Sequence, residues 1–241
     1  MAKRVVILSG PSGVGKGPLL AALRRYYADM VWAELILCTS RSPRLKRNTG
    51  MFEVHGRDYY FLPRGLFSQL DPQRFIVAPV RSVLQAIDLE VLQDLLSGHD
   101  LVIGEVHPSL ARPLVEWLRA NRPEVRVVSV FLLPVSPEEV QTAGGQSGKA
   151  PEQVVYELMK VKLRRRGEDP PSKVEERARA AWGEIQMSRD YDFQLVNHAG
   201  EDDIQAWTDP LAEEPRRVLD EFVAIAKGRV QDASQLKLFP V

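Results

Sequence analysis

A glycine-rich segment near the N-terminus carries the clearest chemical signal in the sequence. Gly10-Pro-Ser-Gly-Val-Gly-Lys16 follows the short apolar run from Val5 to Leu8 and precedes a segment with helical spacing, Leu19 to Arg25. In such a strand–loop–helix context, successive backbone N–H groups point at a phosphate, the glycines permit close approach, and the lysine reaches the outer phosphates. The segment therefore predicts a nucleotide phosphate site.

The usual magnesium ligand is absent from this segment. A serine or threonine normally follows the lysine and coordinates Mg²⁺ through its hydroxyl, whereas Gly17 and Pro18 follow it here. Proline is acceptable in a first helical turn, so the helix is expected to form. Mg²⁺ would have to be held through waters and substrate oxygens, as this ion commonly permits. No residue is assigned as a metal ligand; the sequence predicts phosphate binding and leaves turnover open.

The elements that position this loop alternate between strand and helix. Residues 101–103, 127–133 and 193–196 are apolar runs of the kind found in covered strands, with helical spacing at 110–120 between the first two. This order predicts an α/β protein with a parallel sheet and helices on both faces, the P-loop NTPase fold. Further helices are expected over 152–166, 172–188 and 207–227, an edge strand at 58–62, and helical ends to the segment 63–96.

The length of 241 residues and 44% hydrophobic content suit one core with a small mobile attachment. We expect one domain over 1–227, with an acceptor-binding part at about 38–90 and a lid at about 160–180. Gly, Gln, Ser, Ala and Pro dominate 141–151, which predicts a flexible loop, and 228–241 reads as a flexible tail.

Charge and composition exclude several classes of function. Lys and Arg total 32, as do Asp and Glu, so no global field draws the chain to nucleic acid or to an anionic membrane. No segment approaches the length of about 20 apolar residues that a membrane span needs. The single cysteine, Cys38, fits a buried position in a reducing compartment. These features favour a cytoplasmic protein.

Four further segments, in chain order, resemble those of guanylate kinases, as does the glycine-rich loop itself. Thr39-Ser-Arg-Ser-Pro-Arg44 is similar to the family's Thr-Thr-Arg-x-Pro-Arg, and residues 53–61 are similar to its Glu-x-x-Gly-x-Asp-Tyr-x-Phe. Residues 164–167 resemble the lid's Arg-x-Arg-Gly, with Arg177 at a second lid arginine, and 191–193 with Asn197 resemble the closing segment. The resemblance covers about residues 4 to 200.

The resemblance implies an ATP-dependent phosphotransferase that uses Mg²⁺ and acts on a nucleoside monophosphate, with GMP as the nearest match. Such transfer depends on positive charge placed around the migrating group, a task that suits arginine. The implied catalytic residues are Lys16, Arg164, Arg166 and Arg177. Those implied for ATP are Gly10, Ser12, Gly13, Val14, Gly15, Lys16, Gly17 and Asn197, and those for the acceptor are Arg41, Arg44, Glu53, Tyr59 and Glu105.

The departures from the family gather where it reads guanine. Leu37 stands where the family has a serine, an ungapped match from Phe75 gives Val77 in place of a glutamate, and 85–88 replace a Tyr-Gly-Thr/Ser segment. An apolar residue in place of a polar reader would leave guanine N–H groups unpaired, at a cost of about 1–3 kcal/mol each. The residues implied to bind the acceptor phosphate (the phosphate grip) are therefore kept, and the choice of base is expected to be altered.

Three functions fit this pattern. The first is a nucleoside monophosphate kinase with altered or relaxed base choice. The second is a sugar-phosphate kinase of the ribose bisphosphate phosphokinase kind, which resembles guanylate kinases without a base reader. The third is a non-catalytic guanylate-kinase-like binding module, favoured by the missing hydroxyl and opposed by Lys16 and the lid arginines.

The C-terminal residues carry a separate motif. Gln235-Leu-Lys-Leu-Phe239 resembles the peptide by which bacterial replication and repair proteins dock on the sliding clamp. A tethered segment of this kind places apolar side chains in a groove, with glutamine as a polar anchor. The alternative is a tail that packs on its own domain. The residues assigned to the clamp are Gln235, Leu236, Leu238 and Phe239, and docking there would place the protein near DNA replication or repair.

Overall fold

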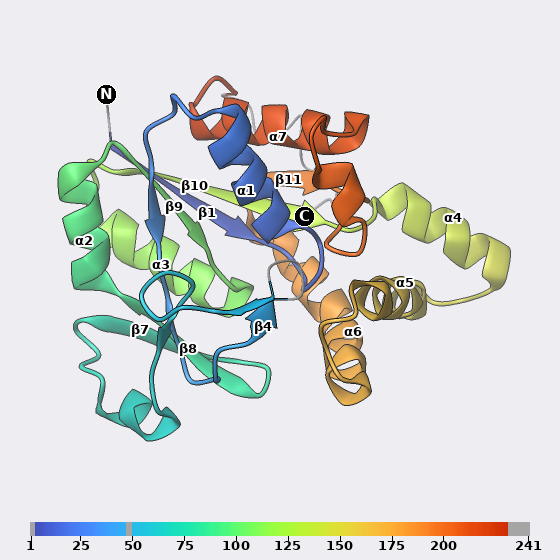
Figure 1. The fold of residues 1–241 in the computed structure, drawn as a ribbon, viewed down its shortest axis with the longest axis horizontal. Helices are drawn as coiled ribbons and strands as arrows, with labels where there is room; N and C mark the ends of the chain where they lie inside the picture. Colours follow the sequence, from blue (N-terminus) through green and yellow to red (C-terminus); the bar gives the residue numbers. More distant parts are fainter. Residues whose placement is uncertain (1–2, 47–49, 231–241) are drawn as a thin grey trace. The chain divides into compact units, whose positions relative to one another are not determined.

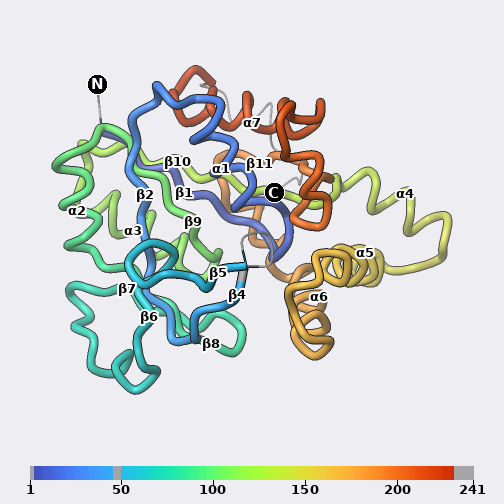
Figure 2. The backbone as a smooth tube through the Cα atoms, in the orientation of Figure 1, coloured from blue at the N-terminus to red at the C-terminus, as the bar shows by residue number. Residues whose placement is uncertain are grey.

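The computed structural model describes residues 3–46 and 50–230, which form two compact units. The first contains residues 1–7 and 31–128, and the second contains 8–30 and 129–241, in each case for the described positions. Figures 1 and 2 show the course of the chain. The glycine-rich loop and the segment predicted to be the lid belong to the second unit, and the residues predicted to bind the acceptor belong to the first.

The main sheet has the strand order β11-β10-β1-β9-β2. Its strands are β1 (Arg4–Ser9), β2 (Ala33–Leu35), β9 (Leu101–Glu105), β10 (Arg126–Leu133) and β11 (Phe193–Val196). The pairs β10–β11 and β2–β9 are both parallel, with Val130 opposite Phe193 and Ala33 opposite Val102. Most residues of these strands are buried, as expected for strands covered on both sides. The predicted α/β fold with a parallel sheet flanked by helices is confirmed.

A smaller sheet in the first unit has the order β6-β3-β8-β7. The strands are β3 (Cys38–Thr39), β6 (Tyr60–Phe61), β7 (Phe75–Val80) and β8 (Val83–Asp88), and a separate hairpin pairs β4 (Leu45–Lys46) with β5 (Met51–Phe52). The helical segments of this unit are η1 (Arg64–Gln69), α2 (Leu89–Gly98) and α3 (Pro108–Asn121). β6 is an edge strand, as the sequence predicted.

The second unit contains the helix that follows the glycine-rich loop and all described helical segments after residue 129. They are α1 (Lys16–Tyr26), α4 (Pro137–Ser147), α5 (Pro151–Arg166), α6 (Pro171–Gln186), η2 (Met187–Asp190), η3 (Ile204–Trp207) and α7 (Glu213–Ala226). α5 and α6 pack side by side as an antiparallel pair (Figure 1). The described residues contain no helix long and apolar enough to cross a membrane.

Two predictions of local structure were wrong in detail, and a third was confirmed. Residues 141–147 form most of helix α4 instead of a loop, because a capping box of Ser136 and Glu139 and a proline in the first turn initiate a helix despite its two glycines. The segment 63–96 is helical at both ends, as predicted, with the β7–β8 hairpin between them. The last helix begins at Glu213, because Trp207 lies in the 3₁₀ turn η3.

The capping box gives a direct test of how α4 is held. Ser136→Ala removes the hydroxyl that accepts a hydrogen bond from the Glu139 backbone N–H at 3.2 Å. We expect local destabilisation of α4 by about 1 kcal/mol, seen as faster amide hydrogen exchange over residues 137–147. Ser147→Ala is the matched control, since its hydroxyl only donates to the Ala143 carbonyl at the far end of the helix. Equal exchange in the two variants would contradict the role of the cap.

Candidate active site

The phosphate loop has the backbone geometry that its glycines predicted. Gly10 and Gly15 have φ of 147° and 99°, where other residues are strained. A Cβ on Gly10 would lie 2.6 Å from the Leu132 carbonyl oxygen, and one on Gly15 would lie 2.6 Å from Asn197 Nδ2. Both positions therefore require glycine. Lys16 begins α1 and is buried, with its Nζ donating to the carbonyls of Gly10 (2.8 Å) and Pro11 (3.0 Å).

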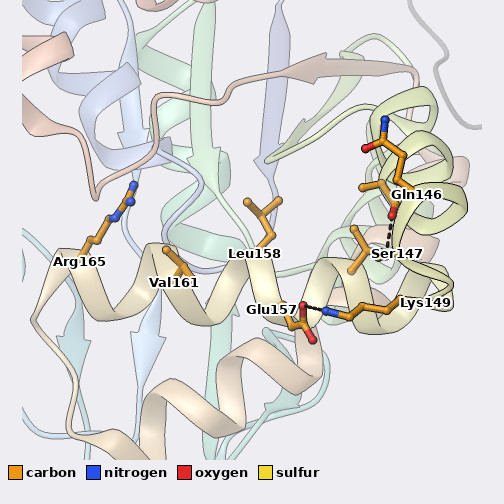
Figure 3. Close-up of a pocket in the computed structure, with 9 residues that line it drawn as sticks. Gln146, Ser147, Lys149, Glu157, Leu158, Val161 and Arg165 are labelled. Atoms are coloured by element: carbon orange, nitrogen blue, oxygen red, sulfur yellow. Dashed lines mark hydrogen bonds and ion pairs between the residues drawn. The ribbon is translucent and has the colours of Figure 1, made fainter.

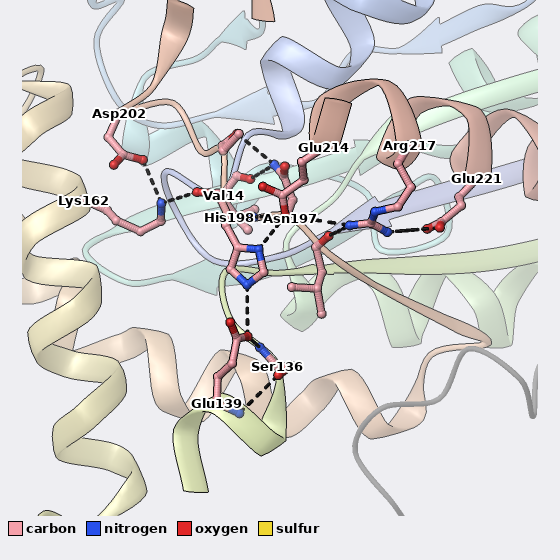
Figure 4. A network of polar contacts seen from close by, with 12 residues as sticks. Val14, Ser136, Glu139, Lys162, Asn197, His198, Asp202, Glu214, Arg217 and Glu221 are labelled. Atoms are coloured by element: carbon pink, nitrogen blue, oxygen red, sulfur yellow. Dashed lines mark hydrogen bonds and ion pairs between the residues drawn. The ribbon is translucent and has the colours of Figure 1, made fainter. Parts of the chain in front are cut away.

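The side-chain amide of Asn197 forms a hydrogen bond to the backbone of the phosphate loop. Its Nδ2 donates to the Val14 carbonyl at 2.6 Å and to the Ala199 carbonyl at 3.1 Å, and Trp207 Nε1 donates to the same Ala199 carbonyl (Figure 4). The side chain is fully buried, and its Oδ1 has no hydrogen-bond partner among the described residues. The sequence assigned Asn197 to ATP, whereas its observed contacts are with the protein backbone of the phosphate loop.

Two of the three predicted lid arginines meet at one carboxylate. Arg166 pairs with Asp169, and Arg177 Nη1 lies 3.2 Å from the same carboxylate. Arg177 also donates to Ser12 Oγ of the phosphate loop at 2.5 Å, and Arg166 donates to Glu201 at 2.6 Å. The side chains of Arg166, Arg177 and Asp169 are only 6%, 8% and 5% exposed. Arg177 thus contacts the phosphate loop directly, and Arg166 is linked to Arg177 through Asp169.

The environment keeps Arg166 charged. Burial by itself would lower the pKa of Arg166, but the charges of Glu201 and Asp169 outweigh it, so the pKa is raised. Arg164 differs, because it is exposed at the end of α5 and makes no ion pair within the described part of the chain. It is therefore the lid arginine with the most freedom to turn toward a ligand.

Sequence reasoning missed two members of this cluster. Lys162 is buried and donates to the His198 carbonyl at 2.6 Å and to Asp202 at 3.0 Å. Asp169 was not singled out, although it bridges the two arginines. A basic face on α5 gives no sign of which cation turns inward, but the acidic pair Glu168-Asp169 directly after the Arg-Gly end of that helix was an available signal.

The acceptor residues form a second cluster, within the first unit. Arg41 makes a two-pronged ion pair with Glu53, its Nη2 donating to Oε1 at 2.8 Å, and the Arg44 backbone N–H donates to the same carboxylate at 2.8 Å. Burial would raise the pKa of Glu53, but these hydrogen bonds outweigh it and the pKa is lowered. Glu53 therefore orients Arg41 and stays ionised.

Tyr59 lies against Arg41 in this cluster. The Arg41 guanidinium stands 4.8 Å from the centre of the Tyr59 ring and 5.6 Å from that of Phe61, within the range of cation–π attraction. Burial and the nearby charge of Glu105 raise the pKa of Tyr59 to about 12. The phenol is therefore neutral at physiological pH and can donate a hydrogen bond to an anion. The structure thus brings Arg41, Glu53, Tyr59 and Glu105 together.

His198 links the loop behind the phosphate site to two helices. Its Nδ1 lies 2.5 Å from Glu214 at the start of α7, and its Nε2 lies 3.0 Å from Glu139 at the start of α4 (Figure 4). Two carboxylates can both accept from the ring only when both nitrogens carry a proton. Burial lowers the pKa of His198, but both carboxylates raise it and the net shift is upward. The two carboxylates thus favour the doubly protonated ring.

A separate groove of about 600 Å³ lies on the inner side of the α4–α5 hairpin (Figure 3). Its floor includes Val154, Leu158 and Val161, and Lys149 at its rim pairs with Glu157 at 2.6 Å. No group of three or more His, Cys, Asp or Glu side chains suited to a metal occurs within residues 3–46 and 50–230.

Comparisons with known proteins identify the family of this chain. The sequence profile of the family described as guanylate kinase matches residues 2–162. The chain belongs to the guanylate kinase family. A guanylate kinase of Trichormus variabilis is 29% identical over 205 residues, covering 84% of this chain and 86% of that protein. One from the Wolbachia of Brugia malayi is 28% identical over 218 residues, covering 90% of this chain and 91% of its own length.

A solved guanylate kinase structure supports the fold of this family member. The guanylate kinase of Anaplasma phagocytophilum aligns with a TM-score of 0.55 and 19% identity, covering 95% of this chain and 86% of that structure. The predicted P-loop NTPase fold is therefore confirmed. The clamp-like residues Gln235, Leu236, Leu238 and Phe239 lie outside the described residues, and their role stays a prediction.

The His198 linkage predicts a pH-dependent stability in this guanylate kinase family member. Because the folded pKa of His198 is raised, the stabilisation is fully present below the ordinary histidine pKa and is lost as pH rises through the folded value. Arg217, 3.8 Å from Glu214, competes for that carboxylate and pairs also with Glu221. We expect the loss in free energy of unfolding caused by His198→Gln to be larger at pH 6 than at pH 9, measured by urea titration.

His99→Gln provides the matched control, because the His99 ring contacts a backbone carbonyl, that of Leu95, at 3.2 Å. The change with pH is read as the difference between the two variants. A loss for His198→Gln that did not change with pH would contradict the assignment of a clamped imidazolium.

Proposed function

We propose that the protein is an ATP-dependent phosphotransferase that acts on a nucleoside monophosphate. The observation that carries this proposal is the hydrogen bond from Arg177 to Ser12, which places a cationic lid helix on the phosphate loop. Arg166 joins the same cluster through Asp169. A loop for phosphates with a lysine and two buried arginines beside it supplies the positive charge that phosphoryl transfer requires.

The residues present fit the phosphates of ATP. Gly10 and Gly15 allow the backbone to approach a ligand, the N-terminus of α1 contributes positive potential, and buried Lys16 supplies the fixed charge. Arg177 and Arg166 would stabilise charge on the migrating group, and Asp169 keeps both guanidinium groups in position.

The fit to Mg²⁺ is weaker, because Gly17 and Pro18 supply no hydroxyl at the start of α1. Mg²⁺ bound together with ATP would neutralise part of the phosphate charge. At this position Mg²⁺ would be coordinated by waters and phosphate oxygens, which this ion tolerates.

The acceptor cluster supports a phosphorylated substrate. Arg41, oriented by Glu53, offers a planar fork for a phosphate, and the neutral Tyr59 phenol offers one further donor. Arg44 is exposed beside them. A nucleoside monophosphate and a sugar phosphate share this group, so the cluster explains the phosphate grip and leaves the rest of the acceptor to be identified by assay.

A second candidate is a non-catalytic binding module, favoured by one observation, the Gly17-Pro18 pair. In that case the loop would bind a nucleotide without turnover. Docking on a bacterial sliding clamp through Gln235 to Phe239 is a separate proposal that rests on the sequence alone.

Turnover separates these candidates. ATP consumption is measured with Mg²⁺ against ribo- and deoxynucleoside monophosphates and ribose 1,5-bisphosphate. We expect a nucleoside monophosphate to be phosphorylated, and Lys16→Ala to lower kcat by about 10²-fold or more, because a fixed charge on the transferring phosphoryl group is lost. Selective turnover of the bisphosphate would instead identify a sugar-phosphate kinase. ATP binding without turnover across the panel would identify a binding module.

Restoring the missing hydroxyl gives an independent test of the role of Mg²⁺. A Cβ on Gly17 would meet no atom within 4 Å, and the residue is exposed in the first turn of α1, so a serine is accommodated. We expect Gly17→Ser to raise kcat by about tenfold, because a direct ligand replaces a mobile water on the ion. Gly17→Ala is the matched control, with the same Cβ and no hydroxyl. Equal rates in the two variants would contradict the proposed cause.

A further inference from the structure

One face of the small sheet carries the acceptor cluster. Thr39 on β3 lies opposite Phe61 on β6 and opposite Gln85 on β8. Directly opposed residues on neighbouring strands point to the same face, so these three side chains share one surface. Since Arg41 stacks on the Phe61 ring, this surface is also the one that holds the phosphate-binding arginine.

The other face of the sheet is apolar and packed. Cys38, Ala86 and Phe67 form its buried cluster, with Tyr60, Phe75 and Leu84 against them. Val77 lies opposite Ala86, and therefore belongs to that face. Val77 is consequently not the position from which a substrate beside Arg41 would be read, although an ungapped match to the family suggested it.

Gln85 is the polar side chain that the register places on the acceptor face of β8. It is half-buried, and its amide has no hydrogen-bond partner among the described residues. Beside it, the Thr39 side chain is fully buried, and its hydroxyl also lacks a partner within the described residues. Leu37, where a polar reader was expected, is buried and apolar. A fully buried hydroxyl such as that of Thr39 is usually paired by protein, water or ligand, and the half-buried Gln85 amide is open to a ligand.

We propose that the Gln85 amide reads the edge of the acceptor's base and sets its selectivity; this rests on the proposed function. An amide presents one acceptor and one donor side by side. This pair matches the N1–H and O6 of a 6-oxopurine, and after a 180° flip it matches the N1 and 6-amino group of adenine. Neither hydrogen bond of the Gln85 amide involves the 2-amino group of guanine. The substrate class is therefore purine nucleoside monophosphates, with GMP and IMP treated alike.

A carboxylate at the same position would behave differently. It only accepts hydrogen bonds, so it favours an edge rich in N–H donors, such as that of guanine, over one with an acceptor at N1. Gln85→Glu should thus convert a permissive reader into a selective one. Gln85→Leu should remove base reading while leaving the phosphate grip of Arg41 in place.

The experiment compares kcat/KM for GMP, IMP and AMP in the wild type, Gln85→Glu and Gln85→Leu. We expect the wild type to use GMP and IMP within about tenfold of each other. Gln85→Glu should raise the ratio of GMP to AMP at least tenfold, and Gln85→Leu should lower kcat/KM for all three by about tenfold or more. The KM for ATP should not change. Gln69→Leu, an exposed glutamine in η1 of the same unit, is the matched control.

The outcomes separate this inference from the proposed function. Turnover in which the ratios among GMP, IMP and AMP are the same in Gln85→Glu as in the wild type overturns the role of Gln85 and leaves the kinase proposal standing. If the wild type turns over none of them, the kinase proposal fails, and equilibrium binding of the same three nucleotides decides the inference. A binding ratio that moves with Gln85→Glu supports it, and one that does not move overturns it.

Discussion

Buried positive charge is the constraint on which the second unit depends. Lys16, Lys162, Arg166 and Arg177 all lie at or beside the phosphate loop with their side chains largely withdrawn from water. An isolated buried cation is unstable, so each must be matched by an anion or by carbonyl oxygens. Asp169 does this for both arginines, Asp202 for Lys162, and the carbonyls of Gly10 and Pro11 for Lys16. The folded protein can therefore keep positive charge at the phosphate loop before any ligand binds.

The same device recurs at the acceptor cluster with one difference. Glu53 fixes the Arg41 fork from one side, and the rings of Tyr59 and Phe61 support it from another, so little rotamer freedom remains to be lost when a phosphate binds. The negative charge of Glu53 reduces the net positive charge of this cluster, but Glu53 also fixes the orientation of Arg41. In both clusters, therefore, acidic residues position the arginines that we propose bind phosphate.

Much of this arrangement could be predicted from the sequence, because glycine and lysine spacing and the order of apolar runs are local signals. The phosphate loop and the strand alternation were predicted in this way, whereas Arg41, Glu53 and Tyr59 were proposed from the resemblance to guanylate kinases. The partners of each cation were not, because pairing depends on tertiary contacts such as that of Arg177 with Ser12, 165 positions apart. Helix α4 was missed because composition suggested a loop, while the capping box that starts it acts through only two side chains.

The face of a β-strand is another property that a match to a family cannot supply. A match assigns Val77 to a reader position by counting residues from Phe75, but side chains alternate, and a shift of one residue moves each of them to the opposite side. The observed register puts Val77 with Ala86 and puts Gln85 with Thr39 and Phe61. The residues proposed to bind the acceptor phosphate are retained, while those that stand where the family reads guanine are apolar, so the proposal looks for selectivity among the polar groups on the same face as Arg41. Gln85 and Thr39 are the residues that the sheet places there.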